Sequence, residues 1–94
     1  MVRSVLPMRF RVLHYASKKD VVTYHDLLKD LAEEYVGEGQ FNKNMMQLHL
    51  DSLRAVGMLE EVDVVFEDNG ELLVSYRITD YGRERLKYLP LEWQ

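Results

Sequence analysis

The chain has 94 residues, of which 47% are hydrophobic, and it carries a formal net charge of −4. A chain of this size buries only about two thirds of its extended surface, so we expect one folded domain, residues 1–94, around a single core. It has no cysteine, which excludes disulfide bonds, zinc sites built from thiolates and thiol nucleophiles.

Uninterrupted apolar runs in the chain are short, and the longest has three residues, as in VVF at 64–66. A signal peptide needs an apolar run of at least about seven residues, and a membrane-spanning helix needs about twenty. We therefore expect no membrane segment, and we expect a cytoplasmic location.

Charge is distributed unevenly along the chain. Residues 1–19 hold five bases and no acid, whereas residues 20–76 hold three bases and thirteen acids, and residues 77–94 hold four bases and three acids. The acidic middle of the chain repels phosphate. A surface that binds a polyanion is therefore expected to draw on the N-terminal bases.

Apolar residues recur every three or four positions in the first segment, SVLPMRFRVLHYASKK. Leu6, Phe10 and Leu13 fall on one side together with Ala16, which predicts an amphipathic helix over about 5–18. Pro7 is tolerated in the first turn of such a helix.

The second segment, DVVTYHDLLKDLAEEYVGEG, predicts a helix over about 24–36. Thr23 and Asp26 have the spacing of a capping box, the leucines form the buried stripe, and Gly37 ends the helix. The valines at 21–22 predict a very short strand before it.

The third segment, FNKNMMQLHLDSLRAVG, predicts a helix over about 43–56. Asn42 is the expected N-cap, Phe41 and Met46 have the positions of a hydrophobic staple, and Gly57 lies where a left-handed residue ends a helix.

The two sides of this third helix differ in polarity. At 100° per residue, the apolar side predicted to face the core carries Met46, His49, Leu50, Leu53 and Val56. The opposite side carries Asn44, Gln47 and Asp51, flanked by Leu48 and Ala55.

After Gly57 the apolar period changes from 3.6 to 2, which predicts a hairpin over about 58–79. Its expected inward residues are Leu59, Val62, Val64 and Phe66 on one arm and Leu72, Val74, Tyr76 and Ile78 on the other. Asn69-Gly70 signals a tight turn between them. Thr79 as N-cap then predicts a last helix over about 80–89, which Pro90 stops.

The predicted order is three helices, a hairpin and a helix, an α+β fold that is mainly helical. The segments VVTYHDLLKDL, LHLDSLRAVGMLEE and YRITDYGRERL resemble the winged helix-turn-helix superfamily, in particular small prokaryotic transcriptional regulators of the PadR-like and MarR-like kinds, many of them archaeal. The resemblance covers residues 5–89. It implies a helix-turn-helix followed by a β-hairpin wing, and a role in DNA binding and transcription regulation.

The resemblance also implies that the third helix enters the major groove of double-stranded DNA, where Asn and Gln side chains can pair with adenine. The expected base-facing residues are Asn44, Gln47, Leu48 and Asp51. Phosphate contacts are expected from the start of this helix and from the basic N-terminal segment, at Asn42, Lys43, Arg9, Arg11, Lys18 and Lys19.

The C-terminal segment, LKYLPLEWQ, has apolar residues beyond the last predicted helix, at Leu86, Leu89, Leu91 and Trp93. A small protein rarely leaves such a patch exposed, so the segment is expected either to pack on the first helix or to form a homodimer interface. Regulators of the resembled kind usually dimerise through terminal helices.

A second function stays open because the hairpin is acidic. Before its first base, Arg77, it carries Glu60, Glu61, Asp63, Glu67, Asp68 and Glu71. Family members commonly place a base at the tip of the wing, so the alternative is a winged-helix module that binds a basic protein partner through its acidic wing.

From the remaining chemistry we expect no enzyme activity, no metal site and no cofactor. The three histidines, His14, His25 and His49, fall on three different predicted helices without the spacing of metal ligands. His49 lies on an apolar side and is expected to be a hydrogen-bonded core residue. There is no phosphate-binding glycine loop and no nucleophile elbow.

Overall fold

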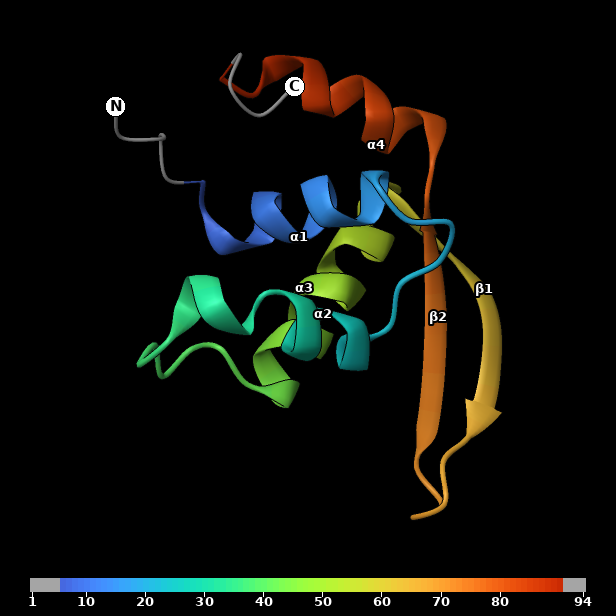
Figure 1. Ribbon diagram of the computed structural model, residues 1–94. Coiled ribbons are helices and arrows are strands. Elements are labelled where there is room, and N and C mark those ends of the chain that lie inside the picture. Colours follow the sequence, from blue (N-terminus) through green and yellow to red (C-terminus); the bar gives the residue numbers. More distant parts are fainter. Residues whose placement is uncertain (1–5, 91–94) are drawn as a thin grey trace.

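A computed structural model describes residues 6–90 of the chain (Figure 1). The described part is α+β and mainly helical, and its elements are α1 (Met8–Ser17), α2 (Tyr24–Asp30), the 3-10 helix η1 (Ala32–Tyr35), α3 (Lys43–Ala55), β1 (Leu59–Phe66), β2 (Leu72–Ile78), α4 (Asp80–Arg85) and the 3-10 helix η2 (Leu86–Tyr88). Their order agrees with the prediction.

The helices form one body with the hairpin along its side. Figure 1 shows α1 crossing α2 and α3, with α4 on the other side of α1 and the far end of the hairpin running beyond the helices. Leu13 of α1, Leu27 of α2 and Leu50 of α3 are fully buried, and Leu59 and Tyr76 close the same core from the strands. No helix within residues 6–90 is long and apolar enough to cross a bilayer.

Three of the four predicted helix starts are confirmed by their side-chain caps. Thr23 and Asp26 form the complete capping box of α2. The Asn42 side chain accepts a hydrogen bond of 2.9 Å from the Met45 amide, and Thr79 caps α4 in the same way. Each cap satisfies an amide that a helix start otherwise leaves without a partner.

The two strands pair antiparallel, with one change of register. Leu59 lies opposite Ile78, and the register shifts between Glu61 and Asp63. Val62, between them, is the extra residue of this bulge, a feature that the period-2 pattern did not predict.

The predicted turn at Asn69-Gly70 is one residue longer than a two-residue hairpin turn. Gly70 has φ +83° whereas Asn69 does not have a positive φ. The Gly70 amide donates to the Glu67 carbonyl at 2.9 Å, and the Glu67 amide donates to the Glu71 carbonyl at 2.8 Å. This is a three-residue turn with a left-handed glycine in last place.

The short strand predicted at residues 21–22 is a single bridge. Val22 exchanges two backbone hydrogen bonds of 2.9 Å with Tyr76. β2 therefore lies between β1 and Val22, which ties the hairpin to the chain just before α2.

The second helix is shorter than predicted. α2 ends at Asp30, and η1 follows after Leu31, which has φ −102° and ψ 2°. The apolar spacing continues through both pieces, so the sequence pattern does not reveal the break. The change of direction lets the Tyr35 ring stack on Phe41, with ring centroids 5.3 Å apart.

The ends of the first and last helices also differ from the prediction. α1 begins at Met8, so Pro7 is its N-cap and not a residue of its first turn. α4 ends at Arg85 and continues as η2 to Tyr88. The α1 difference follows from the extended ψ of Pro7, 142°, which places it outside the helix.

Some residues expected to face the core are exposed. Phe10 is 38% exposed, because α1 turns Val12 and Tyr15 inward, and the Tyr15 hydroxyl donates to the Asp30 carboxylate at 2.5 Å. Val56 is 58% exposed because α3 ends at Ala55 and Val56 is its C-cap. On the hairpin, Val62, Val64, Phe66 and Leu72 are exposed. β1 is the outer strand, with β2 between it and the helices (Figure 1).

Gly82 is the position in α4 where the packing leaves no room for a side chain. A Cβ atom there would lie 2.3 Å from the Met58 carbonyl oxygen and 2.8 Å from Cγ1 of Ile78. We predict that Gly82→Ala lowers the free energy of unfolding by about 1–3 kcal/mol, because α4 must move away from the β1 start.

Urea unfolding of the purified chain measures this effect. Gly39→Ala is the matched control, since nothing lies within 4 Å of a Cβ at Gly39, and it is expected to change stability by less than about 0.5 kcal/mol. Equal stability of the two variants would contradict the close packing of α4 on the hairpin.

Candidate functional site

The side of α3 that faces away from the core is the candidate site. Met46, Leu50 and Leu53 are buried as predicted, whereas Asn44 and Leu48 are exposed on the opposite side, Leu48 to 49%. Together these two side chains form a surface along the first half of α3, which we call the outward face.

The flank of α3 that faces the hairpin is held by three polar contacts. The Lys43 ammonium lies 2.5 Å from the Glu71 carboxylate, and Arg54 lies 3.4 Å from Glu61. Between them, Gln47 contacts β2. Residues 43, 47 and 54 fall on one side of a helix, so the whole flank is used to hold the hairpin.

The central contact is a closed set of hydrogen bonds between Gln47, Asp51 and Tyr76. The Gln47 amide donates to the Tyr76 oxygen at 2.8 Å and to Asp51 at 3.1 Å, and the Tyr76 hydroxyl donates to the same Asp51 oxygen at 2.8 Å. Burial first, and then the bond to Asp51, raise the pKa of Tyr76. The Gln47 amide nitrogen and one of the two Asp51 carboxylate oxygens are therefore engaged within the protein.

Of the four predicted base-facing residues, the structure leaves Asn44 and Leu48 directed outward without such a contact to β2. Asp51 is exposed but accepts two hydrogen bonds, and Gln47 is half-buried. Tyr76, which binds Gln47 and Asp51, lies 29 positions from Gln47, so no local sequence signal reveals the pairing.

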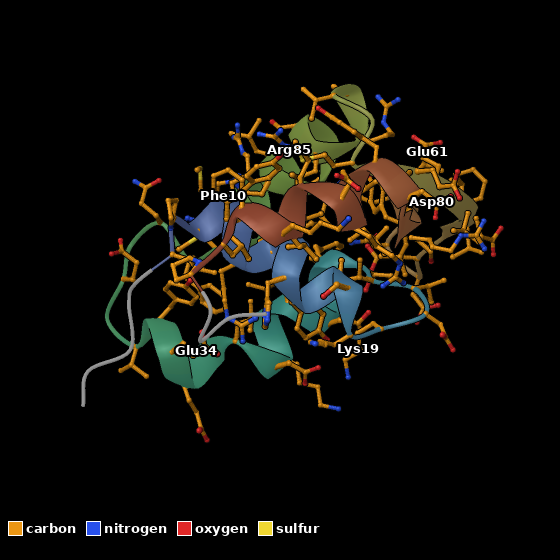
Figure 2. All side chains as sticks on the ribbon, turned by 90° about the horizontal axis from the view of Figure 1, so that it is seen from above. Phe10, Lys19, Glu34, Glu61, Asp80 and Arg85 are labelled. Carbon is orange, nitrogen blue, oxygen red and sulfur yellow. The ribbon has the colours of Figure 1, made fainter. Side chains whose placement is uncertain are left out.

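Two of the predicted phosphate-binding bases, Arg11 and Lys19, contact acids of η1 and α2. Arg11 donates twice to the Glu34 carboxylate, at 2.6 and 2.9 Å, and its side chain is only 13% exposed. Lys19 lies 3.8 Å from Asp30, and Lys18 precedes it as the exposed C-cap of α1. Seen from above, Lys19 and Glu34 lie on the α2 side of α1, whereas α3 lies on its other side (Figure 2).

Arg9 is the base of α1 that reaches α3. Its Nε donates to Nδ1 of His49 at 3.2 Å, so this histidine is a hydrogen-bonded, buried residue as predicted. Burial, and secondarily the charge of Arg9, lower the pKa of His49. The neutral ring is also the form that accepts a hydrogen bond at Nδ1.

A cavity of about 360 Å³ opens beside this contact. It lies between the start of α1, η1 and α3, and its lining is Met8, Tyr35, Glu38, Gln40, Met45 and His49. Within the described residues, no group of three His, Asp or Glu side chains is placed to share a metal ion.

The end of the hairpin contacts the starts of α2 and α3. The Tyr24 hydroxyl donates to both Glu67 oxygens, at 3.0 and 3.1 Å, and the His25 ring also contacts Glu67. The hydrogen bond from His25, followed by that from Tyr24, lowers the pKa of Glu67 against the opposing effect of burial. The hydrogen bond to Glu71 raises the pKa of Lys43.

Sequence reasoning missed Tyr24 and His25 as site residues. They lie more than forty positions from Glu67, and their only local feature is their place beside the N-cap of α2. The cluster forms only where the hairpin packs against the start of α2, and no local sequence pattern specifies that contact.

Half of the hairpin acids contact the protein's own cations. Three of the six acids form ion pairs, which join Glu60 to Arg77, Glu61 to Arg54 and Glu71 to Lys43. A fourth, Glu67, contacts the His25 ring. The hairpin is therefore less available to a basic partner than its sequence alone suggests.

The predicted dimer residues lie partly outside the described chain. Leu86 is half-buried against the core, and the Leu89 amide donates to the Leu86 carbonyl at 3.1 Å. Leu91 and Trp93 lie outside residues 6–90. A comparison of the sequence with protein-family models found no match, and a search of curated proteins found none either.

The environment of His49 predicts a pH dependence of stability. Because its pKa in the folded protein lies below the ordinary value, the unfolded chain takes up a proton first as the pH falls. This contribution to stability is complete above about pH 6.5 and is lost as the pH falls below it.

Urea unfolding at pH 7.5 and pH 5.5 tests this contribution in the wild-type chain and in His49→Gln, whose side chain can still accept from Arg9. We predict that the wild-type chain loses more stability between the two pH values than the variant does. His14 and His25 are present in both chains, so their contributions to the pH dependence cancel in the comparison. Equal losses would show that His49 titrates normally.

Proposed function

We propose that the chain is a winged helix-turn-helix protein that binds double-stranded DNA and regulates transcription. The order of α1, α2, α3 and the hairpin supports this proposal. So does the pairing of Val22 with β2 beside β1, since it gives the small sheet a third, one-residue strand. In this proposal α2 and α3 are the helix-turn-helix, and the hairpin is the wing.

The observation that carries the proposal is the outward face of α3. Asn44 and Leu48 are exposed on the first half of a 13-residue helix whose N-cap, Asn42, is formed. An Asn side chain can pair with adenine through two hydrogen bonds, and an apolar side chain can contact the thymine methyl group. The start of a helix also favours a nearby phosphate.

The electrostatics set the expected strength of binding. Residues 42–78 hold three bases against seven acids, and Arg11 and Lys19 contact Glu34 and Asp30 on the α2 side of α1. Few phosphates are then neutralised by the interface, so the salt dependence of binding is expected to be shallow. Specific contacts at the outward face have to supply much of the affinity.

We further propose that the protein binds DNA as a homodimer, through the segment that follows α4. Each copy then places its own α3 on one half-site, as two-fold symmetric regulators do. Equilibrium sedimentation of the wild-type chain and of Leu89→Glu distinguishes a dimer that uses this segment from a monomer.

Selection of sites from a random DNA pool tests the proposed function directly. We predict enrichment of a defined site, and we predict that Asn44→Ala lowers the preference at one base pair by about 1–3 kcal/mol. Gln47→Ala is the matched control on the same helix. It removes the bond to Tyr76, costs about 1 kcal/mol of stability and leaves the base preference unchanged.

Two results of the same selection would contradict the proposal. If no site is enriched at low salt, the chain does not read DNA. If Gln47→Ala changes the base preference and Asn44→Ala does not, the outward face has been assigned to the wrong residues.

The second candidate function is protein binding by the hairpin. The observation that favours it is the exposure of apolar side chains near the turn, where Phe66 is 77% exposed and lies opposite the exposed Leu72. Such residues on a projecting hairpin are typical of protein contacts. Since half of the six hairpin acids are already paired with Lys or Arg, the apolar residues and not the acids would carry this contact.

We predict that Phe66→Ser with Leu72→Ser leaves the free energy of unfolding within about 0.5 kcal/mol, because both side chains are already exposed. If the hairpin binds protein, the double variant loses the partner that co-purifies with the wild-type chain. Val36→Ser, at a position that is also exposed but lies away from the hairpin, serves as the control. Retention of the partner would rule out this second function.

A further inference from the structure

Three side chains from two helices converge on the end of the hairpin. They are the Tyr24 hydroxyl, the His25 ring and the Lys43 ammonium, and they contact the carboxylates of Glu67 and Glu71. We propose that these three groups form a binding site for a DNA phosphate, and that Glu67 and Glu71 occupy it in the free protein. This inference rests on the proposed function, and we call the three groups the phosphate site.

The geometry of the phosphate site is that of an oxyanion site. Tyr24 donates to both oxygens of one carboxylate, at 3.0 and 3.1 Å, and Lys43 lies 2.5 Å from an oxygen of the other. The Lys43 ammonium also lies 5.0 Å from the centre of the Tyr24 ring. A hydroxyl, an imidazole and an ammonium are the donors that bind carboxylate or phosphate oxygens through charge-assisted hydrogen bonds.

The site is fixed in place by the fold. Tyr24 is buried in the core except for its hydroxyl end, where it meets Glu67. Lys43 is the first residue of α3, directly after the N-cap Asn42 and directly before Asn44. A phosphate held by Lys43 therefore lies beside the start of the outward face, where the DNA backbone runs if α3 lies in the groove.

The carboxylates stand where the phosphate would be bound. Both belong to the turn of the hairpin, and the backbone hydrogen bond from Glu67 to Glu71 holds them together. The lowered pKa of Glu67 and the raised pKa of Lys43 mean that these groups are charged near neutral pH. A DNA phosphate must then displace the two carboxylates before it reaches the three groups of the phosphate site, so the two glutamates compete with it directly.

This competition differs from general repulsion by an acidic hairpin, and the difference can be measured. Glu60 lies on the same hairpin and carries the same charge, but it pairs with Arg77, away from the phosphate site. Removing its charge weakens the overall negative field without freeing the site. Glu60→Gln is therefore the matched control for Glu67→Gln and Glu71→Gln.

The experiment measures binding of the full chain to its selected DNA site at several salt concentrations. We predict that Glu67→Gln with Glu71→Gln binds about tenfold more tightly at low salt, and that the log–log salt slope steepens by about 0.9 for each phosphate newly contacted. Glu60→Gln is expected to change affinity by less and to leave the slope unchanged. Adding Lys43→Gln to the double variant is expected to remove the gain.

A second measurement needs no DNA. Titration of inorganic pyrophosphate into isotope-labelled protein should shift the NMR signals of His25 and of the Lys43 amide in the double variant, but not in the wild-type chain. Glu71→Gln alone serves if the double variant does not fold, since the Glu71 side chain is 57% exposed. Urea unfolding of each variant identifies any that fail to fold.

Each outcome separates the two proposals. If the wild-type chain binds DNA but the double variant gains nothing over Glu60→Gln, the phosphate site is wrong and the DNA-binding proposal stands. If neither protein binds DNA but pyrophosphate shifts the signals of the double variant, an oxyanion site exists without the DNA function. If neither ligand binds, both proposals are overturned.

Discussion

The placement of the hairpin against α3 depends most on Tyr76. Its backbone pairs with Val22 on one side and with Glu61 of β1 on the other, and its buried ring lies in the core. Its hydroxyl meets Gln47 and Asp51 of α3. One residue thus connects the chain before α2, the hairpin and the candidate reading helix. A buried hydroxyl with two satisfied partners strongly favours one arrangement over others, because leaving it without partners is costly.

That arrangement determines which polar residues of α3 remain for a ligand. A helix in solution presents every residue of its outer half, but the hairpin covers one flank of α3 and takes up Lys43, Gln47 and Arg54. The same contacts pair acids of the hairpin with these cations. The local charge of the hairpin, which along the sequence suggests strong repulsion of phosphate, is therefore reduced by ion pairs between elements distant in the chain. Exposed pairs of this kind contribute little to stability, so another ligand can replace them at small cost.

The sequence predicted those features that depend on neighbours along the chain. The caps at Thr23, Asn42 and Thr79 lie at the predicted positions, because capping is set by residues three positions apart. The turn glycine, Gly70, and the short pairing at Val22 were also predicted from local signals.

The missed features depend on contacts between distant elements. The break after α2 follows from how η1 meets Phe41 and α1, and the exposure of Phe66 follows from the position of β1 as the outer strand of the hairpin. The pairing of Gln47 with Tyr76, and of Tyr24 with Glu67, each spans about thirty to forty positions. Periodicity places a residue on a side of its helix, but it does not say which other element covers that side.

The small size of the outward face bears on how a DNA-binding function would achieve specificity. One good contact between a side chain and a base supplies about 1–3 kcal/mol of discrimination, and Asn44 is the polar residue that the hairpin leaves on this face. Regulators typically prefer their sites over other DNA by about 4–10 kcal/mol. A single copy of this chain therefore falls short of that range, whereas two copies on a symmetric site double the number of base contacts. Phosphate contacts cannot make up the difference, because they strengthen binding to the site and to all other DNA alike.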